Sequence, residues 1–149
     1  MSLRWYGRAR LVLTLIGLLI AGYLTLLHYD SAVPLVCSAG SIIDCETVLG
    51  SASSVVLGVP VAAWGVLWFV VALALAVASA RTHERGEPAT LRAVGLAWVL
   101  AGTAGVLWLV YQEIGVIGKI CAWCTTVHVV ILALLVIQVT SDPRHAPRP

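Results

Sequence analysis

Two of the four cysteines, Cys121 and Cys124, form a C-x-x-C motif at the start of an apolar run that continues to Val139. A run of roughly 20 apolar residues is long enough to cross a bilayer as a helix. In the first turn of such a helix the two cysteines share one face, and the positive end of the helix dipole favours a thiolate there. His128 follows one turn later. These three side chains predict redox chemistry at a membrane surface.

The other two cysteines, Cys37 and Cys45, have a C-x7-C spacing that can close a small loop as a purely structural clip. Two pairs in one chain instead favour exchange, in which mixed disulfides pass two electrons from one pair to the other. A zinc site built from the C-x-x-C motif with His28 or His128 is disfavoured, because a second motif of zinc-knuckle spacing is missing. We therefore expect catalytic cysteines and no metal. A static disulfide or two inert buried thiols is the structural alternative.

The composition is that of a membrane protein. The 149 residues are 60% hydrophobic and only 11% charged, with a mean hydropathy of +0.99, whereas about a quarter of the residues in a soluble domain are charged. Four apolar runs are each near the length of a membrane span: Leu11–Tyr29, Leu57–Ala80, Ala93–Tyr111 and Ile120–Val139. The sequence predicts an all-α integral membrane protein, a four-transmembrane-helix bundle in a single domain over residues 1–149, surrounded by lipid and binding no nucleic acid.

Basic residues are confined almost entirely to the two termini and the link between the second and third runs. They are Arg4, Arg8, Arg10, Arg81, Arg85, Arg92, Arg144 and Arg148, and only Lys119 lies elsewhere. The positive-inside rule then predicts a cell-membrane protein with both termini in the cytoplasm and all four cysteines on the outer side, where disulfides persist. The first run is longer than a signal-peptide core and has no A-x-A cleavage site, so we expect it to be retained.

The links between the runs differ in length. The outer link, residues 30–56, contains the segment Ser41–Leu49, whose apolar residues recur at helical intervals; it predicts a short outer-surface helix with Gly50 as its stop. The link Gly115–Lys119 is so short that the third and fourth helices should be antiparallel neighbours. The tail, residues 140–149, is Pro-rich and is expected to be disordered in the cytoplasm.

The cysteine spacing resembles the bacterial form of the vitamin K epoxide reductase family. The C-x7-C pair, Ser51 six residues after Cys45, and a C-x-x-C motif opening the last helix are specific as a set, and the likeness covers nearly the whole chain. It implies a four-helix bundle around a pocket for a quinone, either menaquinone or ubiquinone, capped by the loop that carries the first cysteine pair.

The resemblance also implies a role for each cysteine. Cys37 would meet the partner protein, and Cys45 would pass electrons to Cys121. Cys124 would then face the quinone. Many bacterial members carry a fused thioredoxin-like domain after the last helix, whereas this chain stops at Pro149. We therefore expect the partner to be a separate thioredoxin-fold, DsbA-like oxidase.

Three further residues are candidates for quinone binding. Ser51 matches the family's hydroxyl residue beside the quinone, and His128 stands where vertebrate members carry a Tyr that hydrogen-bonds a quinone carbonyl. Trp64, one helical turn before Trp68, is a candidate wall for the quinone ring. Val61 aligns with a vertebrate Asn and cannot form its hydrogen bond, which favours plain quinone reduction over epoxide reduction.

These features together predict a membrane thiol oxidase and quinone reductase that supports disulfide bond formation. Two alternatives remain. A DsbB-like quinone-linked oxidase performs the same task, but its C-x-x-C pair precedes the wider pair, the reverse of the order seen here. A non-catalytic membrane subunit would use its disulfides only to staple the outer loops.

Overall fold

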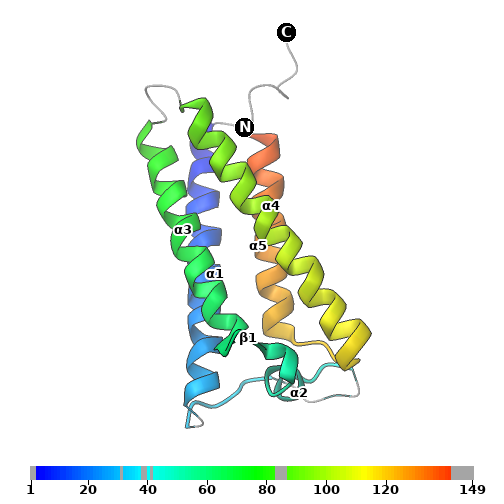
Figure 1. Ribbon diagram of the computed structural model, residues 1–149. Coiled ribbons are helices and arrows are strands. Elements are labelled where there is room, and N and C mark those ends of the chain that lie inside the picture. The colour runs from blue at the N-terminus through cyan, green and yellow to red at the C-terminus, as the bar shows by residue number, and fades with distance from the viewer. Residues whose placement is uncertain (1–2, 31, 38–39, 41, 83–86, 142–149) are drawn as a thin grey trace.

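Four long helices form the protein in this computed structural model, which describes residues 3–30, 32–37, 40, 42–82 and 87–141. They are α1 (Leu3–Tyr29), α3 (Val61–Thr82), α4 (Ala89–Tyr111) and α5 (Ala122–Thr140), and they run alongside one another as a bundle (Figure 1). All four are long and apolar enough to cross a membrane. The predicted fold class, an all-α bundle of four membrane-spanning helices, is confirmed.

Each long helix packs against two others. Helix α1 contacts α3 and α5, and α4 contacts α5 and α3, so the adjacency of the last two helices agrees with their short link. The start of α1 and the end of α5 lie at the same end of the bundle (Figure 1). The opposite end carries the short helix α2 (Cys45–Leu49) and the strand β1 (Val55–Val56). The described cysteines are therefore gathered at one end.

Small residues allow the helices to approach closely. The Phe69 side chain is fully buried against Gly17 of α1, and Trp68 packs against Gly102 of α4; a Cβ at either glycine would clash with the ring. Close approach over small residues is the usual packing mode of membrane helices. The core cluster around these contacts consists of Ala21, Phe69, Val99, Val106, Val130, Ile131 and Leu134.

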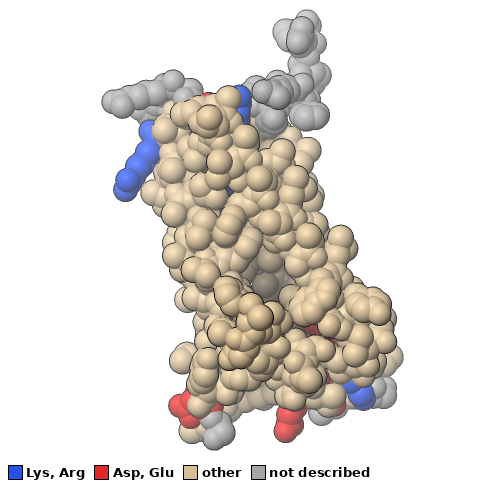
Figure 2. Space-filling model, in the orientation of Figure 1, with Lys and Arg blue, Asp and Glu red and all other residues tan. Residues whose placement is uncertain are grey.

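The outside of the bundle is apolar between its ends. Leu19 is 73% exposed and Leu107 is 65% exposed, as suits side chains that face lipid. In the view of Figure 2 the charged side chains lie towards the two ends of the molecule, and an uncharged band separates them. The dimensions and surface fit a bundle that spans a bilayer.

The second helix begins at Val61 and not at Leu57, where the apolar run starts. Leu57 (φ 55°) and Gly58 (φ 78°) both adopt left-handed backbone conformations and form a two-residue turn between β1 and β2 (Val59–Pro60). Positive φ at both central residues is typical of a tight hairpin turn. Apolar content alone could not separate this hairpin from the helix that follows it.

The other boundaries also differ from expectation. Helix α1 begins at Leu3, eight residues earlier than the apolar run, and α4 begins at Ala89 and continues as the π-helical turn η3 (Gln112–Ile117). The short helix predicted within residues 41–49 is only α2, and it is preceded by backbone that pairs with another segment, while Gly50 caps its end as predicted. The predicted disordered tail lies outside the described residues from position 142 onward.

Candidate active site

The segments preceding Cys45 and Cys121 run side by side. Ile43 and Ile120 form a parallel β-bridge, and the Asp44 N–H donates a 3.0 Å hydrogen bond to the Ile120 carbonyl. Because each cysteine follows this bridge within two residues, the backbone pairing brings Cys45 and Cys121 into one buried cluster. Their exposed fractions are 1% and 0%. A backbone contact that joins distant segments therefore places one cysteine of each pair together.

Helix α2 holds Cys45 in that position. Its N-cap, Asp44, accepts hydrogen bonds from the N–H (3.0 Å) and the hydroxyl (2.7 Å) of Thr47. The backbone bond and then the hydroxyl bond hold the pKa of Asp44 below its usual range. A capping carboxylate stabilises a helix start, so this short helix has a fixed beginning, with Cys45 as its first residue.

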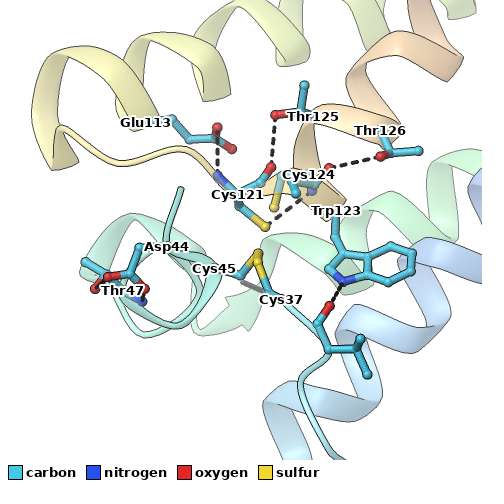
Figure 3. Close-up of a disulfide and its surroundings, with 12 residues drawn as sticks. Cys37, Asp44, Cys45, Thr47, Glu113, Cys121, Trp123, Cys124, Thr125 and Thr126 are labelled. Atoms are coloured by element: carbon cyan, nitrogen blue, oxygen red, sulfur yellow. Dashed lines mark hydrogen bonds between the residues drawn. A yellow bond between two sulfur atoms is a disulfide. The ribbon is translucent and has the colours of Figure 1, made fainter. Parts of the chain in front are cut away.

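The four cysteines occur as one disulfide and two thiols. Cys37 and Cys45 are joined, with their Cα atoms 6.1 Å apart, while Cys121 and Cys124 are free. Figure 3 shows the Cys121 sulfur directed towards this disulfide. The predicted loop pair is therefore present as a disulfide, and a thiol of the C-x-x-C pair lies next to it.

Cys121 caps helix α5 with its sulfur. The helix begins at Ala122, and the Cys124 N–H donates a 3.3 Å hydrogen bond to Cys121 Sγ. A hydrogen bond from the Cys124 thiol lowers the pKa of Cys121, and backbone N–H groups of the helix start add to this effect against the opposing effects of burial and the Glu113 charge. The expected preference for a thiolate at the helix start therefore applies to Cys121.

Cys124 faces a different environment. It lines a partly open cavity of about 430 Å³ between the long helices and the segment that joins α1 to α3, whereas Cys121 is not part of the cavity wall. Cys121 is buried with Cys45 in one cluster, and Cys124 both packs against this cluster and lines the cavity. The sulfur atoms thus form a series from Cys37–Cys45 through Cys121 and Cys124 to the cavity.

The three predicted quinone-binding residues all line this cavity. The Ser51 hydroxyl donates to the Val48 carbonyl at 2.7 Å, and Trp64 Nε1 donates to the Val56 carbonyl at 3.3 Å. The structure thus brings Ser51, Trp64 and His128 together with Cys124 on one cavity wall. The Ser51 hydroxyl and the Trp64 N–H already donate to backbone carbonyls, so neither is free to donate to a ligand.

Buried donors without a protein partner suit a ligand that carries carbonyl oxygens. His128 is only 5% exposed, and none of the hydrogen bonds among the described residues involves its ring. Trp68 Nε1 is buried and also has no partner in the described part of the chain, and Trp68 lines the cavity. A largely apolar pocket of this size with few polar groups is typical of small-molecule sites. The residues present therefore fit a quinone.

The contacts of Trp123, which lies between the two cysteines of the motif, were not predicted from the sequence. Its Nε1 donates a 2.8 Å hydrogen bond to the Val36 carbonyl, next to Cys37 (Figure 3), and its ring packs edge-to-face on Tyr23 at 5.3 Å. The Tyr23 hydroxyl in turn donates to the Pro34 carbonyl at 2.9 Å. The C-x-x-C motif thus holds the segment that precedes the loop disulfide.

Glu113, two residues after the third apolar run, is a further site residue that was not predicted from the sequence. Glu113 is buried, and its Oε2 accepts the Cys121 N–H at 3.4 Å. It lines the cavity as well. The available signal was an acidic residue at the edge of an apolar run, but the π-helical turn that directs it inward could not be read from the sequence.

Four membrane-spanning helices that hold two cysteine pairs in series against an apolar cavity define a membrane protein suited to thiol–disulfide exchange. The model of the vitamin K epoxide reductase family matches residues 8–139. The chain belongs to this family, whose members are membrane thiol–disulfide oxidoreductases that use a quinone.

Proposed function

We propose that this protein is a thiol oxidase that takes electrons from a thioredoxin-fold dithiol and delivers them to a quinone, supporting disulfide bond formation. The observation that supports it is the order of the sulfur atoms. Cys121 lies beside the Cys37–Cys45 disulfide, whereas Cys124 lies on the cavity. This order gives each pair a separate substrate.

The exchange conserves electrons and protons at each step. The partner's two thiols reduce the Cys37–Cys45 disulfide, and the partner leaves as a disulfide. The Cys45 thiolate then attacks the Cys121–Cys124 disulfide at Cys121, releasing Cys124 as a thiol, and Cys37 resolves the mixed disulfide. The products are a loop disulfide and two thiols, which is the pairing observed.

The cavity residues bind and orient the acceptor. A quinone bound there supplies a two-electron oxidant for the Cys121–Cys124 dithiol. His128 and Trp68 offer hydrogen bonds to carbonyl oxygens, Ser51 offers an acceptor, and Trp64 forms part of the wall. Val61 lines the same cavity without a polar group, which supports quinone reduction and not epoxide reduction. Menaquinone and ubiquinone both remain candidates.

Family membership bears on the two alternatives. It favours the order in which the C-x-x-C pair comes last and weighs against a DsbB-like oxidase, where that pair comes first. A non-catalytic subunit stapled by disulfides needs neither a free C-x-x-C pair nor a cavity next to it, yet both are present. The catalytic proposal accounts for these features and the staple does not.

The fold supports an orientation with the cysteines outside the cell membrane. The described basic residues of α1, α3 and α4, among them Arg8, Arg81 and Arg92, lie in the halves of their helices remote from the cysteines. The positive-inside rule puts that end in the cytoplasm. A separate DsbA-like oxidase outside the membrane would then reach Cys37.

The function is tested by a stoichiometric experiment in the absence of oxygen. Fully reduced protein is mixed with a soluble quinone, and quinol is measured by absorbance. After an acid quench, alkylation of the denatured protein reports its disulfides. We expect one quinol for each disulfide formed, counted over both pairs, because exchange passes a disulfide made at Cys121–Cys124 on to Cys37–Cys45. Disulfide formation without quinol, or no consumption of quinone, would contradict this proposal. The disulfides would then serve only to staple the outer loops of a non-catalytic subunit.

The orientation makes a separate prediction. A membrane-impermeant maleimide added to intact spheroplasts after reduction should label Cys37, because this partly accessible cysteine lies at the end of the bundle that we place outside. A cysteine placed at Ser79 on the opposite end of α3, in a chain whose native cysteines are replaced by serine, is the control and should react only after lysis. Labelling of the native cysteines that requires lysis would reverse the orientation and the partner assignment.

His128→Phe should weaken the quinone step alone. A lost hydrogen bond to the ligand costs on the order of 1–2 kcal/mol, so quinone KM should rise or kcat should fall roughly tenfold. Exchange among the four cysteines, followed by alkylation and mass spectrometry, should be unchanged. His128→Tyr should recover most of the activity because it restores a donor.

The matched control for this variant is Thr126→Val on the same helix. Thr126 is exposed, and its hydroxyl donates to the Ala122 carbonyl at 2.9 Å, away from the cavity. This change should leave the quinone response at the parent value. A parent-like response in His128→Phe as well would place His128 outside the binding site.

A further inference from the structure

Glu113 is the only buried acidic residue in the described ranges, at 6% exposed. It stands in the π-helical turn η3, and its backbone carbonyl accepts the N–H groups of Gly118 and Lys119, the latter at 3.1 Å. Gly118 adopts a left-handed conformation (φ 70°) that closes this turn. Single π-helical turns are frequent at functional sites. The backbone thus fixes a carboxylate at the inner side of the C-terminal end of the third span.

The Glu113 carboxylate lies against the C-x-x-C motif. Its Oε2 accepts the Cys121 N–H at 3.4 Å (Figure 3), and its charge acts on the thiols of both Cys121 and Cys124. Within the described ranges this N–H is the only hydrogen-bond donor to the carboxylate. An ionisable group at membrane depth with so few partners is costly and indicates a functional role.

Few other titratable groups share this environment. Cys124 and His128 lie on α5 and Cys121 is its N-cap, while His28 of α1 lines the same cavity. The wall contributed by α3 contains no ionisable side chain. In the link before Cys121, Lys119 interacts electrostatically with Asp44, the N-cap residue of α2. Among the described residues that line the cavity, Glu113 is therefore the only acidic one.

We propose that Glu113 is a positioning residue that limits the ionisation of the reduced Cys121–Cys124 pair, an inference that rests on the proposed relay. A negative charge beside a thiol disfavours the thiolate. At Cys121 this charge opposes the Cys124 thiol and the helix start, which both favour the thiolate. Stabilising the thiolate favours the reduced pair over the disulfide and raises its reduction potential. Such a pair would hold its two electrons and would not pass them to the quinone.

The chemistry balances with the quinone as acceptor. Oxidation breaks two S–H bonds and forms the Cys121–Cys124 bond, and the two electrons and two protons leave with the quinol. If the Glu113 charge destabilises only the thiolate forms of the pair, removing that charge should change the reduction potential of the pair only at a pH where thiolates are populated. The expected signature is an effect that grows with pH.

The test uses the full chain with Cys37→Ser and Cys45→Ser, so that only the second pair remains. The pair is equilibrated with glutathione buffers at several pH values, quenched with acid and alkylated after denaturation. Glu113→Gln keeps an oxygen that can accept the Cys121 N–H and removes the charge. Near about pH 6 it should match the parent; near about pH 9 it should be more oxidising by roughly tenfold in equilibrium constant, about 30 mV for two electrons.

Two further variants complete the test. Glu46→Gln removes an exposed carboxylate next to Cys45 on α2 and should follow the parent at every pH. Glu113→Asp moves the carboxylate away from the cysteines because its side chain is shorter. It should shift the reduction potential less than Glu113→Gln but with the same dependence on pH, so the inference stays testable if the glutamine variant does not fold. If the reduction potentials of Glu113→Gln and the parent coincided at all pH values, or differed by the same amount at every pH, the inference about Glu113 would be overturned. Because no quinone is present, failure of the quinone assay would count against the proposed function and not against this result.

Discussion

Cys45→Ala is expected to accumulate as an interchain mixed disulfide with a thioredoxin-fold partner, joined through Cys37. In the parent, Cys45 resolves the first mixed disulfide, so the adduct is transient. Without Cys45, the thiol that resolves this bond in the relay is missing. We expect the adduct to rise from a trace to roughly the majority of the protein at excess partner, measured on non-reducing gels and by mass spectrometry of the linked peptides.

The structure gives a reason for assigning this contact to Cys37. Cys45 is 1% exposed and is covered by its own cluster, whereas Cys37 is partly accessible at the surface. Cys37→Ala is the matched control, and it should form little adduct because its remaining loop thiol is buried. An adduct that forms on Cys45 in Cys37→Ala and never on Cys37 in Cys45→Ala would exchange the roles of these two cysteines.

The long helices and the identities of the cysteines could be predicted because both depend on local sequence. Hydropathy over roughly 20 residues locates a span, and the C-x-x-C spacing already places Cys121 and Cys124 on one helix start. The ends of the spans were predicted less well. Leu57 and Gly58 are as apolar as the helix after them, so only their backbone conformation, with φ of 55° and 78°, reveals the hairpin.

The contacts that align the two cysteine pairs were beyond sequence reasoning. The Ile43–Ile120 bridge and the bond from Trp123 to the Val36 carbonyl each join segments more than 70 positions apart. The residue types at these four positions do not indicate which segment each of them contacts. Glu113 had a signal, an acid at the border of an apolar run, but its burial depends on a π-helical turn that follows from the geometry of the link and not from composition.

Cys124→Ala is expected to abolish quinone reduction and leave the bundle folded. Cys124 is the sulfur on the cavity, and without it no second thiol remains to form the disulfide that releases two electrons. Turnover with a thiol donor and a quinone should fall by at least about a thousandfold, the scale seen when a member of a catalytic unit is removed. Because the change deletes one partly buried sulfur, the stability loss should stay near 1 kcal/mol, measured by thermal unfolding in detergent.

The same variant distinguishes a relay from a staple. In a relay, the remaining Cys121 thiol can still attack the neighbouring loop disulfide, so a Cys45–Cys121 mixed disulfide should collect and be detected as a cross-linked peptide after acid quench. Thr125→Val is the matched control: it alters the next residue, whose hydroxyl donates to the Cys121 carbonyl at 2.9 Å, and should retain most of the turnover. A Cys124→Ala protein that unfolds at a much lower temperature, yet reduces quinone at the parent rate while folded, would assign this cysteine to stability. Lost turnover with a retained fold and a trapped Cys45–Cys121 bond would place Cys124 at the last step of electron transfer.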